Sequence, residues 1–297
     1  MRAAFIILLT SLLPLLCHSQ SSISYDYISS STLKDDDGNS YGKGDIQIIS
    51  GRFNMPLSLK MNEKRQPTMW TATLSAKYGM LNNSGSTDYL NPDEIINTSI
   101  NITHIRPIND RWGLIISLGA GVYAMPDYIR WESILANGGF SFIYNMNKNF
   151  RLGVGGGLTN SFGTPILLPM IYINWKTRGK YELNLDFAGR LRASAATWLS
   201  TRVKMELTAI EMDGMSAVIK VDGKTKIYSS TMFKSYITPS YHFNKHLSVY
   251  LGLGADWRRS ANIRNRKLKD MFNFNHSGDR HFTSAFRITA GLRYQLK

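Results

Sequence analysis

The sequence predicts an all-β protein, an antiparallel transmembrane β-barrel of about 12–14 strands that follows an N-terminal signal peptide. Three observations predict it. Apolar and polar residues alternate with period two through most of the chain, short polar turns alternate with longer polar connections, and aromatic residues gather beside the short turns. Each predicted strand therefore has one apolar face and one polar or charged face.

The N-terminus predicts export from the cytoplasm. Residues 1–19 have the organisation of a secretory signal, because Arg2 precedes an apolar run that ends at Leu16. This run is shorter than the roughly 20 apolar residues that a transmembrane helix needs. Cleavage after Ser19 would leave residues 20–297 as a single barrel domain.

The amino-acid composition limits the kinds of binding partner that the protein is expected to have. The chain holds 35 lysines and arginines against 21 acidic residues, a formal net charge of +14. For an exported protein this charge indicates outer-membrane lipid and lipopolysaccharide, not nucleic acid, as the anionic partner. Cys17 is the only cysteine, so an intrachain disulfide and a thiolate–zinc cluster are excluded. A lipoprotein with Cys17 as its first residue is an alternative. No metal or cofactor is expected.

A short hairpin recurs along the chain. In each copy a three-residue polar turn separates two alternating segments, and the apolar residues keep the same phase relative to the turn. The copies cover residues 108–118, 141–157, 199–207 and 241–254. Alternation on both sides of a tight polar turn is typical of a β-hairpin.

The strands follow in order between these turns and the longer connections. The expected strands are residues 23–27, 45–59, 70–78, 96–108, 112–122, 141–146, 150–157, 171–175, 181–187, 190–199, 203–209, 236–243, 247–257 and 282–296. We expect a loop at 213–230, with a small hairpin at Asp222-Gly223, and a second long loop at 258–280. His104 and Arg106 fall on an otherwise apolar face; Arg106 could extend to a membrane rim, whereas the sequence offers no reason for His104.

Two features favour a membrane barrel over a soluble β-domain. The apolar residues beside the turns are mostly aromatic, as in an interfacial girdle: Trp112, Tyr144, Phe150, Trp175, Tyr181, Tyr241 and Phe243. The opposite face carries charge in mid-strand, as a wet lumen would: Lys77, Arg151, Lys204, Arg287 and Arg293 with Glu182, Asp186 and Glu206.

The last strand carries an assembly signal. Gly291, Tyr294 and Leu296 fit the terminal pattern that the barrel assembly machinery recognises, although the chain ends on Lys297 and not on an aromatic residue. With the signal peptide and the recurring hairpins, the mature chain resembles an uncharacterised family of outer-membrane β-barrel proteins from Gram-negative bacteria, a domain of unknown function. The resemblance implies the fold and the outer membrane, and it implies no reaction and no site residues.

The sequence favours a non-enzymatic barrel, either a narrow pore with a mild anion preference or a structural and binding surface. The anion preference rests on an excess of basic residues on the lumen face. A basic outer loop could also hold lipopolysaccharide phosphates through Arg258, Arg259, Arg264, Arg266, Lys267 and Lys269.

The alternative is a hydrolase of outer-membrane lipid or lipopolysaccharide that uses the last outer loop, where His276 and His281 flank Asp279. No Gly-x-Ser-x-Gly or His-Glu-x-x-His motif accompanies this loop. We therefore expect no catalytic residues.

Overall fold

The computed structural model describes residues 20–64, 66–86, 91–160, 165–175, 181–187, 191–265 and 279–295. The expected signal peptide lies outside them. The strands are β1 Gln20–Asp35, β2 Ser40–Met61, β3 Pro67–Gly85, β4 Glu94–Pro107, β5 Trp112–Ala124, β6 Ile134–Asn147, β7 Phe150–Thr159, β8 Ile166–Trp175, β9 Tyr181–Phe187, β10 Leu191–Trp198, β11 Val203–Val221, β12 Lys224–His242, β13 Leu247–Ser260, β14 Asn262–Asn265, β15 Arg280–Phe282 and β16 Ala285–Gln295. One 3₁₀ turn, η2 Trp131–Ser133, precedes β6.

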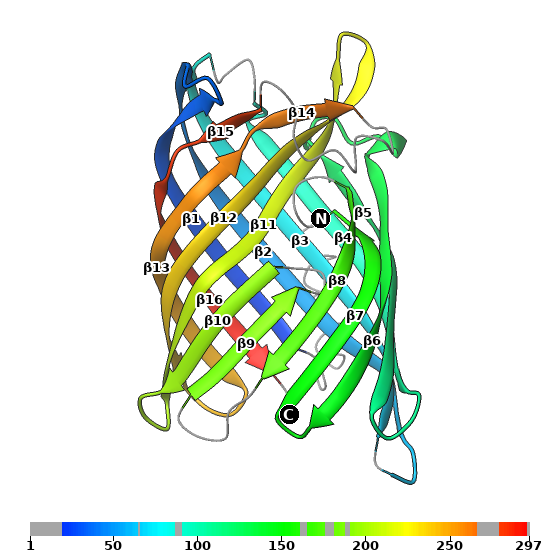
Figure 1. Cartoon of the computed structure of the whole chain (residues 1–297). Coiled ribbons are helices and arrows are strands. Elements are labelled where there is room, and N and C mark those ends of the chain that lie inside the picture. The colour runs from blue at the N-terminus through cyan, green and yellow to red at the C-terminus, as the bar shows by residue number, and fades with distance from the viewer. Residues whose placement is uncertain are drawn as a thin grey trace, which may run out of the picture.

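The strands form a closed antiparallel barrel (Figure 1). Each strand from β1 to β12 pairs with the next, and β16 pairs with both β13 and β1. The short β14 and β15 continue β13 and precede β16 in the chain, so the wall has 14 strands. This confirms the predicted fold and the higher of the two expected strand numbers. No described helix is long and apolar enough to cross a membrane.

Most of the short turns gather at one end of the barrel, which we call the turn end, and the longer connections lie at the other, the outer end (Figure 1). A side-chain oxygen organises the recurring turn. Asn109 Oδ1 accepts hydrogen bonds from the N–H groups of Arg111 and Trp112, both at 2.9 Å. Asn244 Oδ1 does the same for His246 and Leu247, at 2.7 and 2.8 Å. An asparagine here satisfies turn N–H groups that would otherwise need water.

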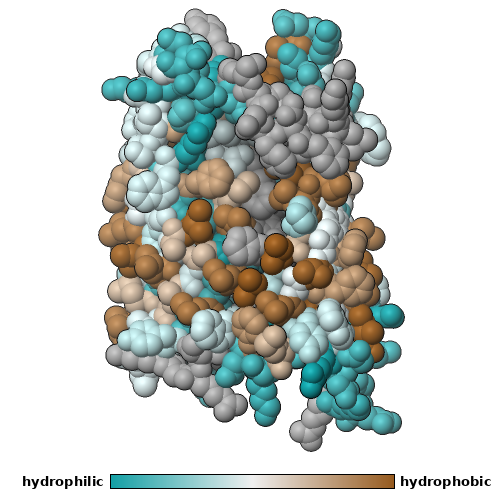
Figure 2. Space-filling view, in the orientation of Figure 1, coloured by the Kyte–Doolittle hydropathy of each residue, from teal (hydrophilic) through white to brown (hydrophobic). Residues whose placement is uncertain are grey.

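The apolar faces of the strands point outward. Ile100, Leu118 and Val154 are 51, 66 and 59% exposed in the protein alone. On the face that it shows, Figure 2 has a band of hydrophobic residues across the middle of the barrel, with hydrophilic residues at both ends. Such a band on a closed barrel, with no unpaired strand edge, is the construction of an outer-membrane barrel, as predicted.

Aromatic rings line the turn end of this band. Trp112 lies against Tyr144 with ring centroids 4.9 Å apart, and Phe150 meets Trp175 edge-on at 6.4 Å. His104, which the sequence left unexplained, stacks on Trp70 at 4.2 Å. The imidazole therefore belongs to the girdle, where an amphipathic ring suits the boundary between lipid and water.

The β11–β12 hairpin is far longer than expected, and the prediction of a loop at 213–230 is wrong. Both strands run to a two-residue turn in which Asp222 and Gly223 have φ of 50° and 72°. This turn confirms the Asp-Gly signal. The alternation is lost in the sequence because both faces of the hairpin are buried: Met215 packs in one apolar cluster and Val218 in another.

The hairpin closes the outer end. β10 begins at Leu191, which pairs with Met212, and β11 continues beyond Met212 to Val218, which pairs in parallel with Ala124 of β5. Its inner face joins a buried apolar core made of Ile28, Leu33, Ile46, Ile48, Leu81, Ile95, Met215, Ala217, Ile219, Tyr228, Met232, Ala261, Phe282 and Ala285. The barrel thus holds a packed core at the outer end and an open lumen below it.

Candidate functional site: the lumen

The lumen contains a cavity of about 620 Å³. One side of its wall carries mostly hydroxyl and amide side chains, with Arg52 of β2 and Lys77 of β3 among them. The inward hydroxyl and amide side chains on that side, from β1 to β7 and the residue after β7, are Ser22, Ser24, Ser50, Thr73, Ser75, Asn97, Ser99, Asn101, Thr103, Ser117, Asn137, Ser141, Thr159 and Asn160. These hydroxyl and amide groups both donate and accept hydrogen bonds, so they can bind water or a polar solute.

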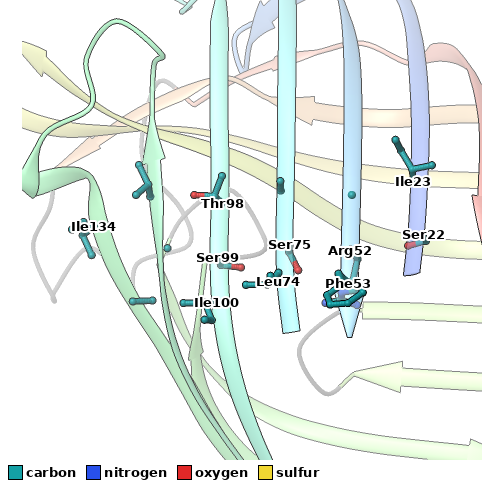
Figure 3. A pocket seen from close by; sticks show the side chains of 15 residues that line it. Ser22, Ile23, Arg52, Phe53, Leu74, Ser75, Thr98, Ser99, Ile100 and Ile134 are labelled. Carbon is teal, nitrogen blue, oxygen red and sulfur yellow. The ribbon is translucent and has the colours of Figure 1, made fainter. Parts of the chain in front are cut away.

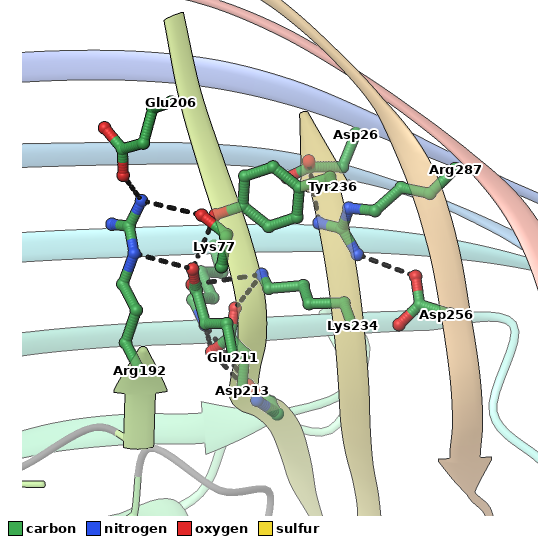
Figure 4. A network of polar contacts seen from close by, with 12 residues as sticks. Asp26, Lys77, Arg192, Glu206, Glu211, Asp213, Lys234, Tyr236, Asp256 and Arg287 are labelled. Carbon is green, nitrogen blue, oxygen red and sulfur yellow. Dashed lines mark hydrogen bonds and ion pairs between the residues drawn. The ribbon is translucent and has the colours of Figure 1, made fainter. Parts of the chain in front are cut away.

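The other side of the lumen is a network of ion pairs (Figure 4). Lys234 of β12 lies 3.3 Å from a carboxylate oxygen of Glu211 and 3.2 Å from one of Asp213. Lys77 also binds Asp213, although β3 and β11 are not neighbours in the sheet. Tyr236 donates its hydroxyl to Glu211 at 2.5 Å.

Arg192 of β10 extends this network. Its guanidinium pairs with Glu206, and its Nε lies 3.4 Å from Glu211 Oε2. Nearer the turn end, Lys204 pairs with Glu182 at 2.7 Å and lies 5.6 Å from the ring of Trp198. The charges of this wall are therefore used in holding strands to one another.

A second buried group of charges sits where the barrel closes (Figure 4). Arg287 of β16 reaches Asp26 of β1 at 2.7 Å and Asp256 of β13 at 2.8 Å. The Arg287 side chain is 2% exposed, and the carboxylate side chains are 12 and 2% exposed. One arginine thus connects the first, last and penultimate strands of the wall.

The structure places the predicted lumen residues as follows. Lys77, Lys204, Arg287, Glu182 and Glu206 face inward in the ion pairs above. Asp186 lines the cavity, and Arg293 lies 4.4 Å from the ring of Tyr250. Arg151 pairs with Asn145 and Asn174 in the sheet, on an inward position of β7.

Sequence reasoning missed four important charges. Asp26 alternates with tyrosines in β1, so the period-two pattern could have placed it on the inward face of the strand. The pairing of β10 with β11 has a bulge opposite Ala193 and Ser194 of β10. Glu211 and Asp213 lie beyond this bulge, which changes which residues of β11 point inward. Lys234 lies in the part of β12 that precedes the expected strand. The four bases of the drawn network, Lys77, Arg192, Lys234 and Arg287, face five acids, Asp26, Glu206, Glu211, Asp213 and Asp256.

The basic residues of the last outer connection do not form one cluster among the described residues. Arg258 is exposed on the outside and pairs with Asp36 at 3.4 Å. Arg259 is only 2% exposed, with its guanidinium 3.8 Å from the ring of Phe282 and donating to the Gly44 carbonyl at 3.1 Å. Arg264 pairs with Asp279 at 3.2 Å. Arg266, Lys267 and Lys269 lie outside the described residues.

The described part of the chain shows no acid–base pair of hydrolase type in this region. Asp279 is bound to Arg264, and His281 Nδ1 lies 4.0 Å from Asp36. Burial lowers the pKa of His281, and nearby Arg258 lowers it further. His276 lies outside the described residues. Among the described residues no group of three or more potential metal ligands is present.

The predicted assembly signal is only partly described. Gly291 faces inward under the ring of Tyr250, and a Cβ at this position would lie 2.5 Å from the Tyr250 hydroxyl and from the Ile23 carbonyl oxygen. Tyr294 lies on the outward face, with its ring centroid 6.4 Å from that of His246. Leu296 lies outside the described residues.

The outer wall carries an apolar groove of about 820 Å³ across β1 to β6 (Figure 3). Its floor is a row of small residues, Gly51, Ala76 and Thr98, paired across the sheet. Bulkier residues of the next row, Phe53 and Leu74 among them, form its edge. The groove lies in the hydrophobic band, so membrane hydrocarbon would fill it.

A comparison with models of known protein families shows which family the chain belongs to. A family model described as "Domain of unknown function (DUF6268)" matches residues 15–295. The chain belongs to this family. The family assignment agrees with the expected resemblance to uncharacterised barrels. No curated protein matches the chain.

Several solved structures match this DUF6268 protein at low identity. The COG4313 outer membrane channel from Pseudomonas putida F1 is 11% identical, with 93% of this chain and 95% of that chain covered and a TM-score of 0.47. The TodX monoaromatic hydrocarbon channel is 10% identical, with 94 and 91% covered and a TM-score of 0.38. The outer membrane protease OmpT from Escherichia coli is 12% identical, with 94 and 97% covered and a TM-score of 0.28.

Proposed function

We propose that this protein is a non-enzymatic outer-membrane barrel that admits small hydrophilic solutes into a narrow lumen. One observation carries the proposal: the cavity of about 620 Å³ is lined by inward hydroxyl and amide groups. A soluble barrel would place apolar residues inside and charges outside, whereas here the apolar band lies outside. The cavity volume falls in the usual range of small-molecule sites, roughly 300–1,000 Å³.

A mild anion preference belongs to this proposal, and it rests on fewer residues than the sequence indicated. Lys77, Arg192 and Arg287 hold carboxylates, so their charges are largely cancelled. Arg151 and Arg293 do not belong to the ion pairs described above. Their fields would favour chloride over potassium in the lumen, but only by a small factor, because the network above holds one acid more than it holds bases and Asp186 also lines the cavity.

Conductance tests the proposal. Purified protein in a planar bilayer under a potassium chloride gradient is expected to conduct, with a reversal potential of the sign for chloride permeation. Arg151→Glu together with Arg293→Glu should move that potential toward potassium, whereas Lys64→Glu, at an exposed site paired with Asp110, should leave it unchanged. A wild-type reversal potential at zero would remove the preference while leaving the channel.

The second candidate is a closed structural or binding barrel, and the apolar core at the outer end favours it. Absence of any conductance and of solute-driven vesicle swelling would support this candidate against the channel. Hydrolysis of outer-membrane lipid or lipopolysaccharide by the purified protein, lost in His276→Ala or His281→Ala, would instead overturn the non-enzymatic assignment.

A further inference from the structure

One buried arginine at the outer end has no carboxylate partner. Among the described residues three lysine or arginine side chains are buried, those of Lys234, Arg259 and Arg287. Lys234 and Arg287 each lie within 3.3 Å of two carboxylates. Arg259 forms no ion pair with a described residue, and Asp45 and Asp256 act on it only from beyond ion-pair distance. A buried guanidinium without a counter-charge is strongly unfavourable, so another partner is needed.

The few contacts of the Arg259 guanidinium leave most of its N–H groups unused. Nη2 donates to the Gly44 carbonyl at 3.1 Å, and the guanidinium lies 3.8 Å from the ring of Phe282. Nε and Nη1 are buried, and neither has a hydrogen-bond partner in the part of the chain that the structure describes. A guanidinium has five N–H donors, and a ring face attracts the cation without accepting their hydrogen bonds in its plane.

Two unpaired hydroxyl groups reach the same region from β12. Tyr228 and Ser230 are fully buried, and neither hydroxyl oxygen has a hydrogen-bond partner among the described residues. Both side chains share the inward face of β12 with Met232, which pairs directly with Arg259 of β13. The Tyr228 hydroxyl is near enough to Arg259 for the two groups to interact electrostatically.

A third unpaired hydroxyl group comes from β1. Ser31 is almost fully buried, and its oxygen also lacks a partner in the described chain. It pairs across the sheet with Gly44, the residue whose carbonyl accepts from Arg259. Two methionines border these donors, because Met232 pairs with Arg259 and Met215 with Ser230. Their unbranched, flexible side chains can adjust to an ion beside them.

We propose that a monovalent inorganic anion such as chloride binds within the outer end of the barrel, between the Arg259 guanidinium and the hydroxyl groups of Tyr228 and Ser31. All these groups can donate hydrogen bonds to an anion. The single charge of Arg259 selects a monovalent ion, since a doubly charged ion would bring uncompensated negative charge into an apolar core. The site lies in this core and not in the lumen cavity, so the inference does not depend on the proposed channel.

The bound anion would hold the closed outer end together. Its ligands come from β1, β12 and β13, which are distant in the chain and meet beside β15 at this end of the barrel (Figure 1). An ion that binds only the folded state lowers the unfolding constant by a factor of one plus its concentration divided by its Kd. Raising chloride from one tenth of Kd to ten times Kd should therefore lower the unfolding constant about tenfold.

Urea unfolding in vesicles of neutral lipid tests this dependence. Sodium chloride or bromide replaces sodium gluconate at constant ionic strength, so that general screening by salt stays unchanged. We expect the tenfold effect in the wild type and none in Arg259→Met. Tyr228→Phe should raise the chloride concentration of half effect by about tenfold, because hydrogen bonds to charged groups are strong. Arg258→Met is the matched control: this neighbouring side chain is 50% exposed and pairs with Asp36, so the full chloride effect should remain.

Anomalous diffraction from crystals soaked in sodium bromide locates the ion. We expect a bromide peak beside Arg259 in the wild type and no such peak in Arg259→Met. Ordered water on Nε and Nη1 with no bromide peak, or equal stability in chloride and gluconate, would overturn the inference. A peak without an effect on stability would mean binding at crystal concentration only and would also overturn it. If Arg259→Met fails to fold, Tyr228→Phe and Ser31→Ala provide the same comparison.

Discussion

Replacing Arg287 with methionine should weaken the barrel more than any exposed charge replacement. Arg287 is 2% exposed and donates to Asp26 and Asp256 at 2.7 and 2.8 Å. Methionine keeps much of the volume but leaves two carboxylates buried in the lumen wall without their shared cation. The same substitution loosens both strand pairs of β16, at the point where the barrel closes.

The expected cost follows from burial. Removing one partner of a buried ion pair costs about 3–5 kcal/mol, and here two charged contacts are lost together. At about 1.4 kcal/mol per factor of ten, the unfolding constant should rise at least a hundredfold. Lys64→Met provides the matched control, because its pair with Asp110 is 66 and 67% exposed and such pairs contribute about 0.2–1 kcal/mol.

Urea unfolding in lipid vesicles, followed by the mobility of unheated samples on a gel, measures both variants. A triple variant, Arg287→Met with Asp26→Asn and Asp256→Asn, should recover most of the loss, because uncharged groups of similar size replace the whole charged triad. An Arg287→Met protein within 1 kcal/mol of the wild type, or a triple variant as unstable as the single one, would refute the idea that this triad holds the seam.

Three further predictions concern folding and assembly. Fractionation should place the mature chain in the outer membrane, and unheated and boiled samples should migrate differently on a detergent gel; a soluble periplasmic product without this shift would contradict the barrel. Tyr294→Asp with Leu296→Asp should leave periplasmic, protease-sensitive protein, because charge on the lipid face costs up to about 2–4 kcal/mol, while Gln295→Asp on the other face should still insert. Gly79→Val should destabilise the closed outer end by about 1–3 kcal/mol through overpacking against Met215, as seen by faster hydrogen exchange in β11; Gly51→Val, with nothing within 4 Å, should not.

The sequence alone determined the local features of this protein. Alternation showed which face of most strands points to lipid, because successive side chains of a strand point to opposite faces. The asparagine turns were equally visible, since Asn109 and Asn244 act on N–H groups two and three residues away. The range of about 12–14 strands, the outer-membrane architecture and the girdle at Trp112 and Trp175 followed from these patterns, whereas the exact number of 14 did not.

Only the tertiary structure decided what the lumen contains. Lys77 and Asp213 are 136 residues apart, and no local pattern links them. The hairpin from 213 to 230 looked like a loop because both its faces are buried, which removes the period-two signal that identifies a strand. The bulge opposite Ser194 changes which residues of β11 point inward, so the period-two pattern did not place Glu211 on the lumen face. The pairing of distant charges and the path of β11 both depend on how the whole barrel closes. The alternation of residues and the turn sequences report only on neighbouring residues, so they could not predict either feature.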